Sequence, residues 1–139
     1  MSDQHQQQFA AELKAQLKHF AGDLERYRHS LFPKLIYTPG IKHLAEAAGA
    51  YWLLDVIASH LLSSDFQAAV RMDARILDLH FWNLAVDKDS SAVVTARVDQ
   101  GEPAFVQQAI PLTDFPLETI DLWVAYDGQF FTLYLPSEH

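Results

Sequence analysis

Cysteine is absent from this chain of 139 residues. Its absence excludes disulfide bonds, thiolate metal sites and cysteine nucleophiles. Basic residues are also scarce, because ten Lys and Arg stand against 18 Asp and Glu and leave a net charge of −8. The few bases are scattered along the sequence. We therefore do not expect direct binding of nucleic acid, which needs clustered Lys and Arg.

Glycine-rich loops and long apolar segments are missing as well. The five glycines stand alone, and no phosphate-binding loop, serine-nucleophile elbow or zinc-enzyme motif surrounds them. The most apolar stretch, residues 38–62, is interrupted by Glu46, Asp55, Ser59 and His60, too often for a membrane span. The polar N-terminus lacks the features of a signal peptide. We expect a cytoplasmic protein that does not insert into membranes.

Metal-ligand spacing is likewise absent among the seven histidines. His43 and Glu46 lie three residues apart, a spacing that carboxylate–histidine metal sites use on helices. This pair supplies at most two ligands and has no second copy, so an exposed helix face is the simpler interpretation. We expect no metal and no other cofactor.

Apolar side chains, in contrast, are plentiful. They make up half of the sequence, which includes nine Phe, five Tyr and three Trp. Such a composition supports a sizeable core, and the length is typical of one domain. No internal repeat, linker or low-complexity stretch divides the chain. We expect a single domain over residues 1–139.

Two helices are expected before a sheet. Apolar residues at intervals of three and four predict an amphipathic helix over residues 5–21. A longer central helix is predicted over residues 39–61, with Thr38 as its N-cap and Pro39 in its first turn. This helix is apolar nearly all round, which is typical of a helix in the middle of a core. Its Gly49 predicts the close approach of another backbone.

The apolar period changes to two from Arg75, and the sheet is expected over about residues 75–135. Asp127-Gly128 is a strong signal for a two-residue hairpin. The connections are too short for parallel crossovers, so the prediction is an antiparallel meander of four to five strands. The predicted strands are 75–86, 92–98, 104–110, 119–126 and 129–135. The fold class is α+β, with both helices on one face of the sheet.

The first predicted strand carries a candidate site. Alternation places Asp78, His80 and Trp82 on one of its faces. A carboxylate and a histidine beside an aromatic ring suit ligand binding or acid–base chemistry. The alternative is a solvated outer face, although its apolar members also suit a protein partner or a dimer interface. Asp121 and Trp123 lie on another strand and can join the same patch.

Asp55 is a second candidate, because it lies among large aliphatic residues in the most apolar part of the central helix. Burying a carboxylate is costly. A functional interpretation is an acid with a raised pKa. The structural interpretation is an acid that pairs with Arg26 or Arg28, or that lies at the wet edge of the helix. On the structural interpretation, Asp55→Asn mainly lowers thermal stability.

Four motifs run in order over nearly the whole chain. They are YTPGIK (37–42), AGAYWLLD (48–55), TDFP (113–116) and LPSEH (135–139). In these motifs the sequence resembles a family of small uncharacterised bacterial proteins, domain of unknown function 6876. It departs from the family at Pro39, where an acidic residue is expected, so a role for an acid at that helix start is not carried over.

The resemblance implies a setting and no activity. Proteins of this kind resemble the cargo of phages, plasmids and conjugative elements. Small acidic proteins in that setting often inhibit host defences, including restriction and CRISPR systems. Fold or family alone does not fix a function, so this implication is an association.

Acidic residues are concentrated in the second half of the chain. Residues 70–139 hold eleven acids and four bases, whereas residues 1–69 hold seven acids and six bases. Solubility alone explains such acidity, but an acidic surface on the strands also attracts basic proteins.

We therefore expect a non-enzymatic interaction protein of a mobile genetic element. In this hypothesis it inhibits a host defence complex, of the anti-CRISPR or antirestriction type, by binding a basic, nucleic-acid-handling partner through its acidic surface. One alternative is a small-ligand binder or small enzyme that uses Asp78 and His80, or Asp55. A second alternative is a structural module that forms a homodimer.

Overall fold

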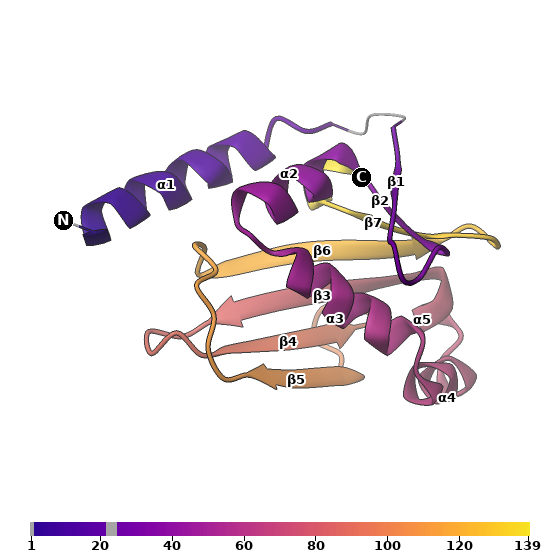
Figure 1. Ribbon diagram of the computed structural model, residues 1–139. Coiled ribbons are helices and arrows are strands. Elements are labelled where there is room, and N and C mark those ends of the chain that lie inside the picture. The colour runs from indigo at the N-terminus through magenta and orange to yellow at the C-terminus, as the bar shows by residue number, and fades with distance from the viewer. Residues whose placement is uncertain (1, 22–24) are drawn as a thin grey trace.

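The computed structural model describes residues 2–21 and 25–139. The described residues form an α+β fold, which confirms the predicted class (Figure 1). The helices are α1 (Ser2–Leu17), α2 (Pro39–Ala47), α3 (Tyr51–Leu61), α4 (Ser64–Met72) and α5 (Arg75–Asp78). The strands are β1 (Tyr27–Arg28), β2 (Leu35–Tyr37), β3 (Leu79–Val86), β4 (Ala92–Arg97), β5 (Val106–Ile110), β6 (Thr119–Tyr126) and β7 (Phe131–Tyr134). A 3-10 turn, Pro136–Glu138, follows β7.

The core lies between the helices and one face of the sheet. In Figure 1, α2 and α3 cross this face, and α1 lies beyond α2 at the edge of the layer. The inward side chains of the central strands and of α2 and α3 are fully buried, and they are mostly Leu, Ile and Val. They include Ile41, Leu44, Leu53, Leu54, Ile57, Trp82, Leu84, Val94, Leu122, Val124 and Leu133. No described helix is both long and apolar enough to span a membrane.

The sheet is mixed, so the prediction of an antiparallel meander of four to five strands was wrong. Its order is β1-β2-β7-β6-β3-β4-β5, and β2 pairs with β7 in parallel. β6 returns to pair with β3 on the side away from β4. The connection from β5 to β6 therefore crosses the end of the sheet, and Phe115 and Leu117 are buried along it. Burial of these two side chains, rather than a tight turn, decides the strand order.

The predicted central helix, residues 39–61, is two helices. Thr38 caps α2 by accepting from the Ile41 N–H, and Pro39 occupies the first turn, as predicted. The helix then ends at Ala47, and Gly49 has a φ of +60°. Left-handed backbone of this kind favours glycine and commonly ends a helix. A Cβ on Gly49 would meet nothing within 4 Å, so backbone conformation and not close packing explains this glycine.

Two other boundaries differ from the prediction. α1 ends at Leu17, before the predicted limit at residue 21. Residues 75–78 form α5 and not the start of a strand, because Asp73 accepts from the Arg75 N–H and begins a helical turn. The side chains alternate between the two faces of the sheet only from Leu79 onward, where β3 begins.

The turn between β6 and β7 has four residues and not two. The Asp127 carboxylate accepts from the N–H groups of Gln129 and Phe130, at 2.8 and 2.7 Å. These backbone donors lower the pKa of Asp127. The wider turn places Trp123 opposite Tyr134. This register differs by two residues from that of a two-residue turn, so each side chain stays on the face that alternation predicts.

The C-terminal turn is fastened to the start of α2. Glu138 accepts from the Thr38 hydroxyl at 2.6 Å, from the Gly40 N–H at 3.3 Å and from the Leu135 N–H at 3.0 Å. A carboxylate at a helix N-terminus is stabilised by the unpaired N–H groups there. Glu138 thus supplies, from the far end of the chain, the acid that Pro39 lacks at this helix start.

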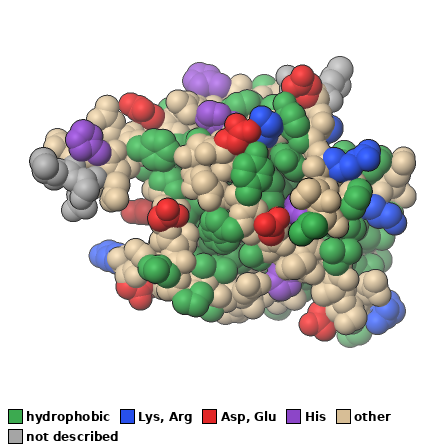
Figure 2. All heavy atoms as spheres, viewed as in Figure 1, with side chains coloured by type: hydrophobic (Ala, Val, Ile, Leu, Met, Phe, Trp, Pro, Cys, Tyr) green, Lys and Arg blue, Asp and Glu red, His purple; other side chains and the backbone are tan. Residues whose placement is uncertain are grey.

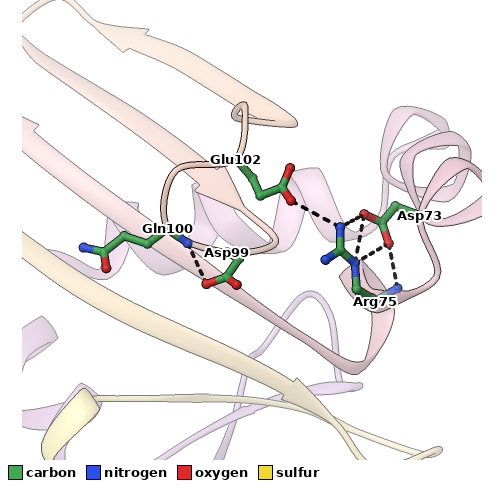
Figure 3. Close-up of polar contacts among 5 residues, drawn as sticks. All are labelled: Asp73, Arg75, Asp99, Gln100 and Glu102. Carbon is green, nitrogen blue, oxygen red and sulfur yellow. Dashed lines mark hydrogen bonds and ion pairs between the residues drawn. The ribbon is translucent and has the colours of Figure 1, made fainter.

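An ion cluster fastens the β4–β5 hairpin to the helices (Figure 3). The Arg75 guanidinium lies 2.7 Å from the Asp73 carboxylate and 3.5 Å from the Glu102 carboxylate. The hydrogen bond from Arg75 lowers the pKa of Asp73. Arg97 donates to the Glu102 carbonyl at 3.1 Å, which holds the same hairpin from the strand side. The segment that leads into β5 is therefore positioned from two sides.

Candidate functional site

The acidic residues do not line the strands as the sequence suggested. Of the eleven acids in residues 70–139, Asp121 alone lies within a strand, and the others occupy helices, turns and loops. On the helix side of the molecule, acidic and basic side chains are interspersed among apolar ones (Figure 2). The strands themselves therefore carry little of the negative charge of the second half of the chain.

Asp55 is an exposed partner of a buried histidine. Its carboxylate lies 2.8 Å from His29 Nε2, and the side chain is 62% exposed, whereas His29 is 6% exposed. The Leu31 and Phe32 N–H groups donate to His29 Nδ1, so the ring proton is on Nε2 and is donated to Asp55. Both ring nitrogens are used to hold the loop before β2 against α3. The structure thus places the acid at the wet edge of the helix, with His29 as its partner.

Asp78, His80 and Trp82 do not form a common outward face. Asp78 lies on α5 and is exposed. His80 and Trp82 lie on β3 and point into the core, with exposed fractions of 0% and 1%. Trp82 pairs with Leu122 on β6, so these two side chains point to the same face of the sheet. Asp121 and Trp123 flank Leu122 along β6 and therefore point to the opposite face. The five predicted binding residues therefore separate into three places.

His80 is enclosed by aromatic rings. Its Nδ1 donates to the Ile76 carbonyl at 2.8 Å, and the rings of Phe66, Trp82 and Phe105 lie 5.4–5.9 Å from its ring centroid. Burial lowers the pKa of His80 to about 4, although the hydrogen bond to Ile76 opposes this shift. Among the described residues, His80 Nε2 and Trp82 Nε1 are buried without a hydrogen-bond partner. His80 is therefore a neutral core residue near pH 7.

The predicted helix pair His43 and Glu46 is engaged elsewhere. His43 Nε2 lies 2.8 Å from the Gln16 amide oxygen, and Lys42 pairs with Glu46 at 2.6 Å. The hydrogen bond from Lys42 lowers the pKa of Glu46. Within residues 2–21 and 25–139, no three His, Asp or Glu side chains gather as metal ligands would.

The face of the sheet turned away from α2 and α3, which we call the outer face, carries an aromatic cluster. Its members are Phe81 on β3, Trp123 on β6, Tyr134 on β7 and the C-terminal His139. The ring of Trp123 lies 5.1 Å from Phe81, 5.9 Å from Tyr134 and 5.0 Å from His139, all edge to face. Such tilted pairs are favourable for aromatic rings. Phe81 and Trp123 are half-buried, and His139 is exposed.

A polar row lies beside the aromatic cluster on the outer face. Asn83 donates to the Asp121 carboxylate and to the Thr119 hydroxyl, both at 2.9 Å. On the other side of Asn83, Arg97 donates to the Thr95 hydroxyl at 3.1 Å. Cross-strand pairing thus fixes the side chains of three strands in place. The outer face offers an aromatic centre with oriented hydrogen-bonding groups at its side.

A groove of about 700 Å³ opens next to this face, between α1 and the part of β6 that β7 does not reach. Lys14 and Lys18 line its helix side, and Glu118 and Asp121 line its strand side. Asp121 therefore borders both the groove and the outer face. Neither Asp78, His80 nor Asp55 lines this groove.

Of the predicted binding residues, Asp121 and Trp123 lie on the outer face, whereas Phe81, Tyr134 and His139 were not predicted. The expectation that His80 and Trp82 lie at the surface of the sheet is wrong, because both side chains are buried. The large apolar side chains on each face of β3 were the available signal, because the face that carries Trp82 and Leu84 is the buried one. His139 joins the cluster through the C-terminal turn, and spacing along the sequence gives no indication of it.

Comparisons with known proteins identify the family of this chain. No match was found among curated proteins. A crystal structure of a protein of unknown function from Enterococcus faecalis is similar at a TM-score of 0.45 and 17% identity, over 84% of this chain and 93% of that chain. Residues 11–139 match a family of unknown function, DUF6876. This chain therefore belongs to the DUF6876 family.

Proposed function

We propose that this protein is a non-enzymatic binding module whose outer face docks a basic protein. The observation that carries the proposal is the aromatic cluster at the centre of a sheet face that the helices leave uncovered. Phe81 and Trp123 are half-buried there, and of the outward side chains of β3, β4, β6 and β7 only Tyr134 is buried. Aromatic side chains are enriched at protein interfaces and dominate their binding energy.

The charge of the chain favours a basic partner. The net charge of −8 attracts cationic surfaces at long range and repels phosphates. At short range, Asp121 lies two residues from Trp123 on the same face of β6. A partner Lys or Arg can therefore pair with the carboxylate while its side chain packs on the indole ring, which is a favourable cation–π arrangement.

The contacts within the outer face support binding rather than catalysis. The hydroxyls of Thr119 and Thr95 accept from Asn83 and Arg97, and among the described residues neither is paired with a histidine. Nucleophilic catalysis needs a hydroxyl within hydrogen-bond reach of a base. Fixed polar groups and tilted rings instead suit a pre-organised docking surface.

At a finer level we propose that the partner is a nucleic-acid-handling protein of a host defence system. Such proteins carry basic grooves for phosphates, which an acidic binding module complements. The defence setting rests on the family resemblance alone. It is tested by infecting a host that carries an active restriction or CRISPR system, with and without this protein. We expect the protein to restore plaque formation, and unchanged plaque numbers across such systems would contradict the finer proposal.

The docking surface is tested by site-specific cross-linking. Because the chain has no cysteine, Thr95→Cys introduces a single thiol beside the polar row, and a photoreactive maleimide can be attached there. Gln67→Cys, exposed on α4, is the matched control. We expect a discrete cross-linked protein from host lysate with Thr95→Cys, absent with Gln67→Cys and weaker when salt rises from about 50 to about 300 mM.

The identity of the cross-linked product decides the class of partner. A basic protein supports the proposal. A product that nuclease removes would instead show that the aromatic cluster stacks nucleic-acid bases, as aromatic sheet faces can. Equal products from both cysteine variants would show that the outer face is not the docking surface.

A further inference from the structure

β5 forms an open edge of the sheet. It is the last strand in the order and pairs with β4 alone. Among the described residues, no backbone group outside β4 hydrogen-bonds to Val106–Ile110. An edge strand directs alternate N–H and C=O groups away from its neighbour, so this edge presents a row of unpaired backbone groups. β5 contains neither a charged residue nor a proline within its five positions.

The opposite edge of the sheet is protected in the ways that edges usually are. β1 has two residues, Tyr27 and Arg28, and one of them is charged. The Arg28 guanidinium lies 5.9 Å from the Phe130 ring centroid, close to the end of that edge. Short length and charge are common protections against strand pairing. β5 has neither, although it is the longer edge.

We propose that β5 pairs with β5 of a second copy of this chain, antiparallel and centred on Gln108. In this register Val106 lies opposite Ile110 of the other copy, and Gln107 lies opposite Ala109. The two Val–Ile pairs and the central Gln108 pair fall on the core side of the sheet, and the two Gln–Ala pairs fall on the outer face. The same five residues serve both copies, as a two-fold symmetric interface requires.

The side chains of β5 favour a second copy over an unrelated strand. The sequence VQQAI is apolar at both ends, so antiparallel self-pairing places Val106 against Ile110 at each end and Gln108 against Gln108 at the centre. Gln108 is held at the centre by a 2.7 Å contact with His60 on α3. Leu112 follows β5 and is 76% exposed, which leaves a large apolar side chain beside the edge for the second copy to cover.

The charge of the chain predicts how the pairing depends on salt. The net charge of −8 on each copy opposes association. Salt screens such repulsion, so the self-pairing strengthens as salt rises. This dependence is opposite to that of the proposed docking of a basic partner.

Sedimentation equilibrium tests the proposal. A two-strand edge buries less area than a standard interface of about 1,600 Å², so we expect a weak dimer and measure up to about 1 mM protein. The wild-type mass is expected to rise from 15.8 kDa toward twice that value. Gln107→Lys with Ala109→Lys places like charges opposite each other across the edge. We expect about tenfold weaker association, since like charges directly opposite are destabilising.

A charge-matched mixture separates edge pairing from other modes. The Gln107→Glu/Ala109→Glu variant alone should show the same weakened association, and an equimolar mixture with the lysine variant should recover wild-type association. Both positions are exposed, so neither variant removes a core contact. Met72→Ser, 88% exposed on α4, is the control and should associate as the wild type does. A wild type that stays monomeric, or lysine and mixed samples that both associate like the wild type, would overturn the proposal.

Discussion

The two buried histidines, His29 and His80, both have structural roles. His29 is held by hydrogen bonds at both ring nitrogens and joins a loop to α3 through Asp55. His80 is enclosed by aromatic rings and donates one hydrogen bond, to the Ile76 carbonyl. Neither residue is presented to a ligand. His80 and Trp82 of the first candidate site thus lie in the core, whereas Trp123 lies on the outer face.

His80 predicts a specific pH dependence of stability. Its pKa is about 4 in the folded chain, whereas an unfolded histidine titrates near 6.5. Between these values the unfolded chain binds more protons, so stability is complete above pH 6.5 and is lost as the pH falls toward 4. Urea unfolding should show a loss of about 2–3 kcal/mol from this residue between pH 7 and pH 4.5.

His80→Phe is the control, because phenylalanine suits the aromatic surroundings and does not titrate. The variant should lack this part of the pH dependence, although other acids still contribute to both curves. Equal losses of stability in wild type and variant would show that His80 is not the buried group that titrates.

The contact between His29 and Asp55 predicts a graded effect of substitution. Asp55→Ala removes the acceptor of a buried ring N–H and should lower the free energy of unfolding by about 1 kcal/mol. Asp55→Asn keeps an acceptor oxygen, so its cost should be smaller. Thermal unfolding of both variants, with Asp114→Ala as an exposed control, checks the order. An alanine variant as stable as the wild type would contradict the structural role.

At the scale of elements, the C-terminal turn contacts the start of α2, and the local sequence does not reveal this contact. Thr38 and Pro39 predicted the start of α2 correctly, because capping depends on neighbours in sequence. The break at Gly49 was missed, because a helical pattern of apolar residues continues across it. Glu138 reaches the same helix start from about one hundred residues away. Such a contact depends on the whole fold, and no periodicity encodes it.

This fastening makes Gly40 a sensitive position. A Cβ at residue 40 would lie 2.6 Å from Glu138 Oε1 and 2.8 Å from Leu135 Cδ1. Overpacking of a well-packed site typically costs about 1–3 kcal/mol, so Gly40→Ala should lower the free energy of unfolding by that amount in urea.

A double-mutant cycle identifies the source of that cost. Glu138→Ala removes the nearer clashing atom, so the combined loss in Gly40→Ala/Glu138→Ala should be smaller than the sum of the two single losses. Strict additivity would show that the contact with Glu138 does not limit residue 40.

For the whole molecule, the sequence predicted the class of fold and the alternation of side chains along each strand better than the order of strands. The alternation of side chains follows from local backbone geometry. Phe81 and Trp82 therefore lie on opposite faces of the sheet, and the wider turn before β7 does not change the faces of the β7 side chains. The return of β6 to β3 and the parallel pairing of β2 with β7 follow from packing between distant segments. For the same reason, the aromatic cluster, which joins residues from three strands and the C-terminus, could not be predicted from positions in the sequence.

Salt concentration separates the two proposed binding surfaces of the sheet. The outer face is proposed to dock a basic protein, and the β5 edge is proposed to pair two copies. Raising the salt concentration weakens the first interaction and strengthens the second, because attraction and repulsion are screened alike. Substitutions at Trp123 act on the face, and those at Gln107 and Ala109 act on the edge.

The most direct test of the central claim is the affinity of the cross-linked partner for the Trp123→Ala variant, measured by titration calorimetry beside the wild type and the Met72→Ser control. Central aromatic residues of an interface cost about 2 kcal/mol or more when truncated, which corresponds to a loss of affinity of about thirtyfold. We predict that loss for Trp123→Ala, with wild-type affinity for Met72→Ser and a retained cooperative thermal transition in both variants. An unchanged dissociation constant for a folded Trp123→Ala variant would contradict the claim that the outer face is the binding surface.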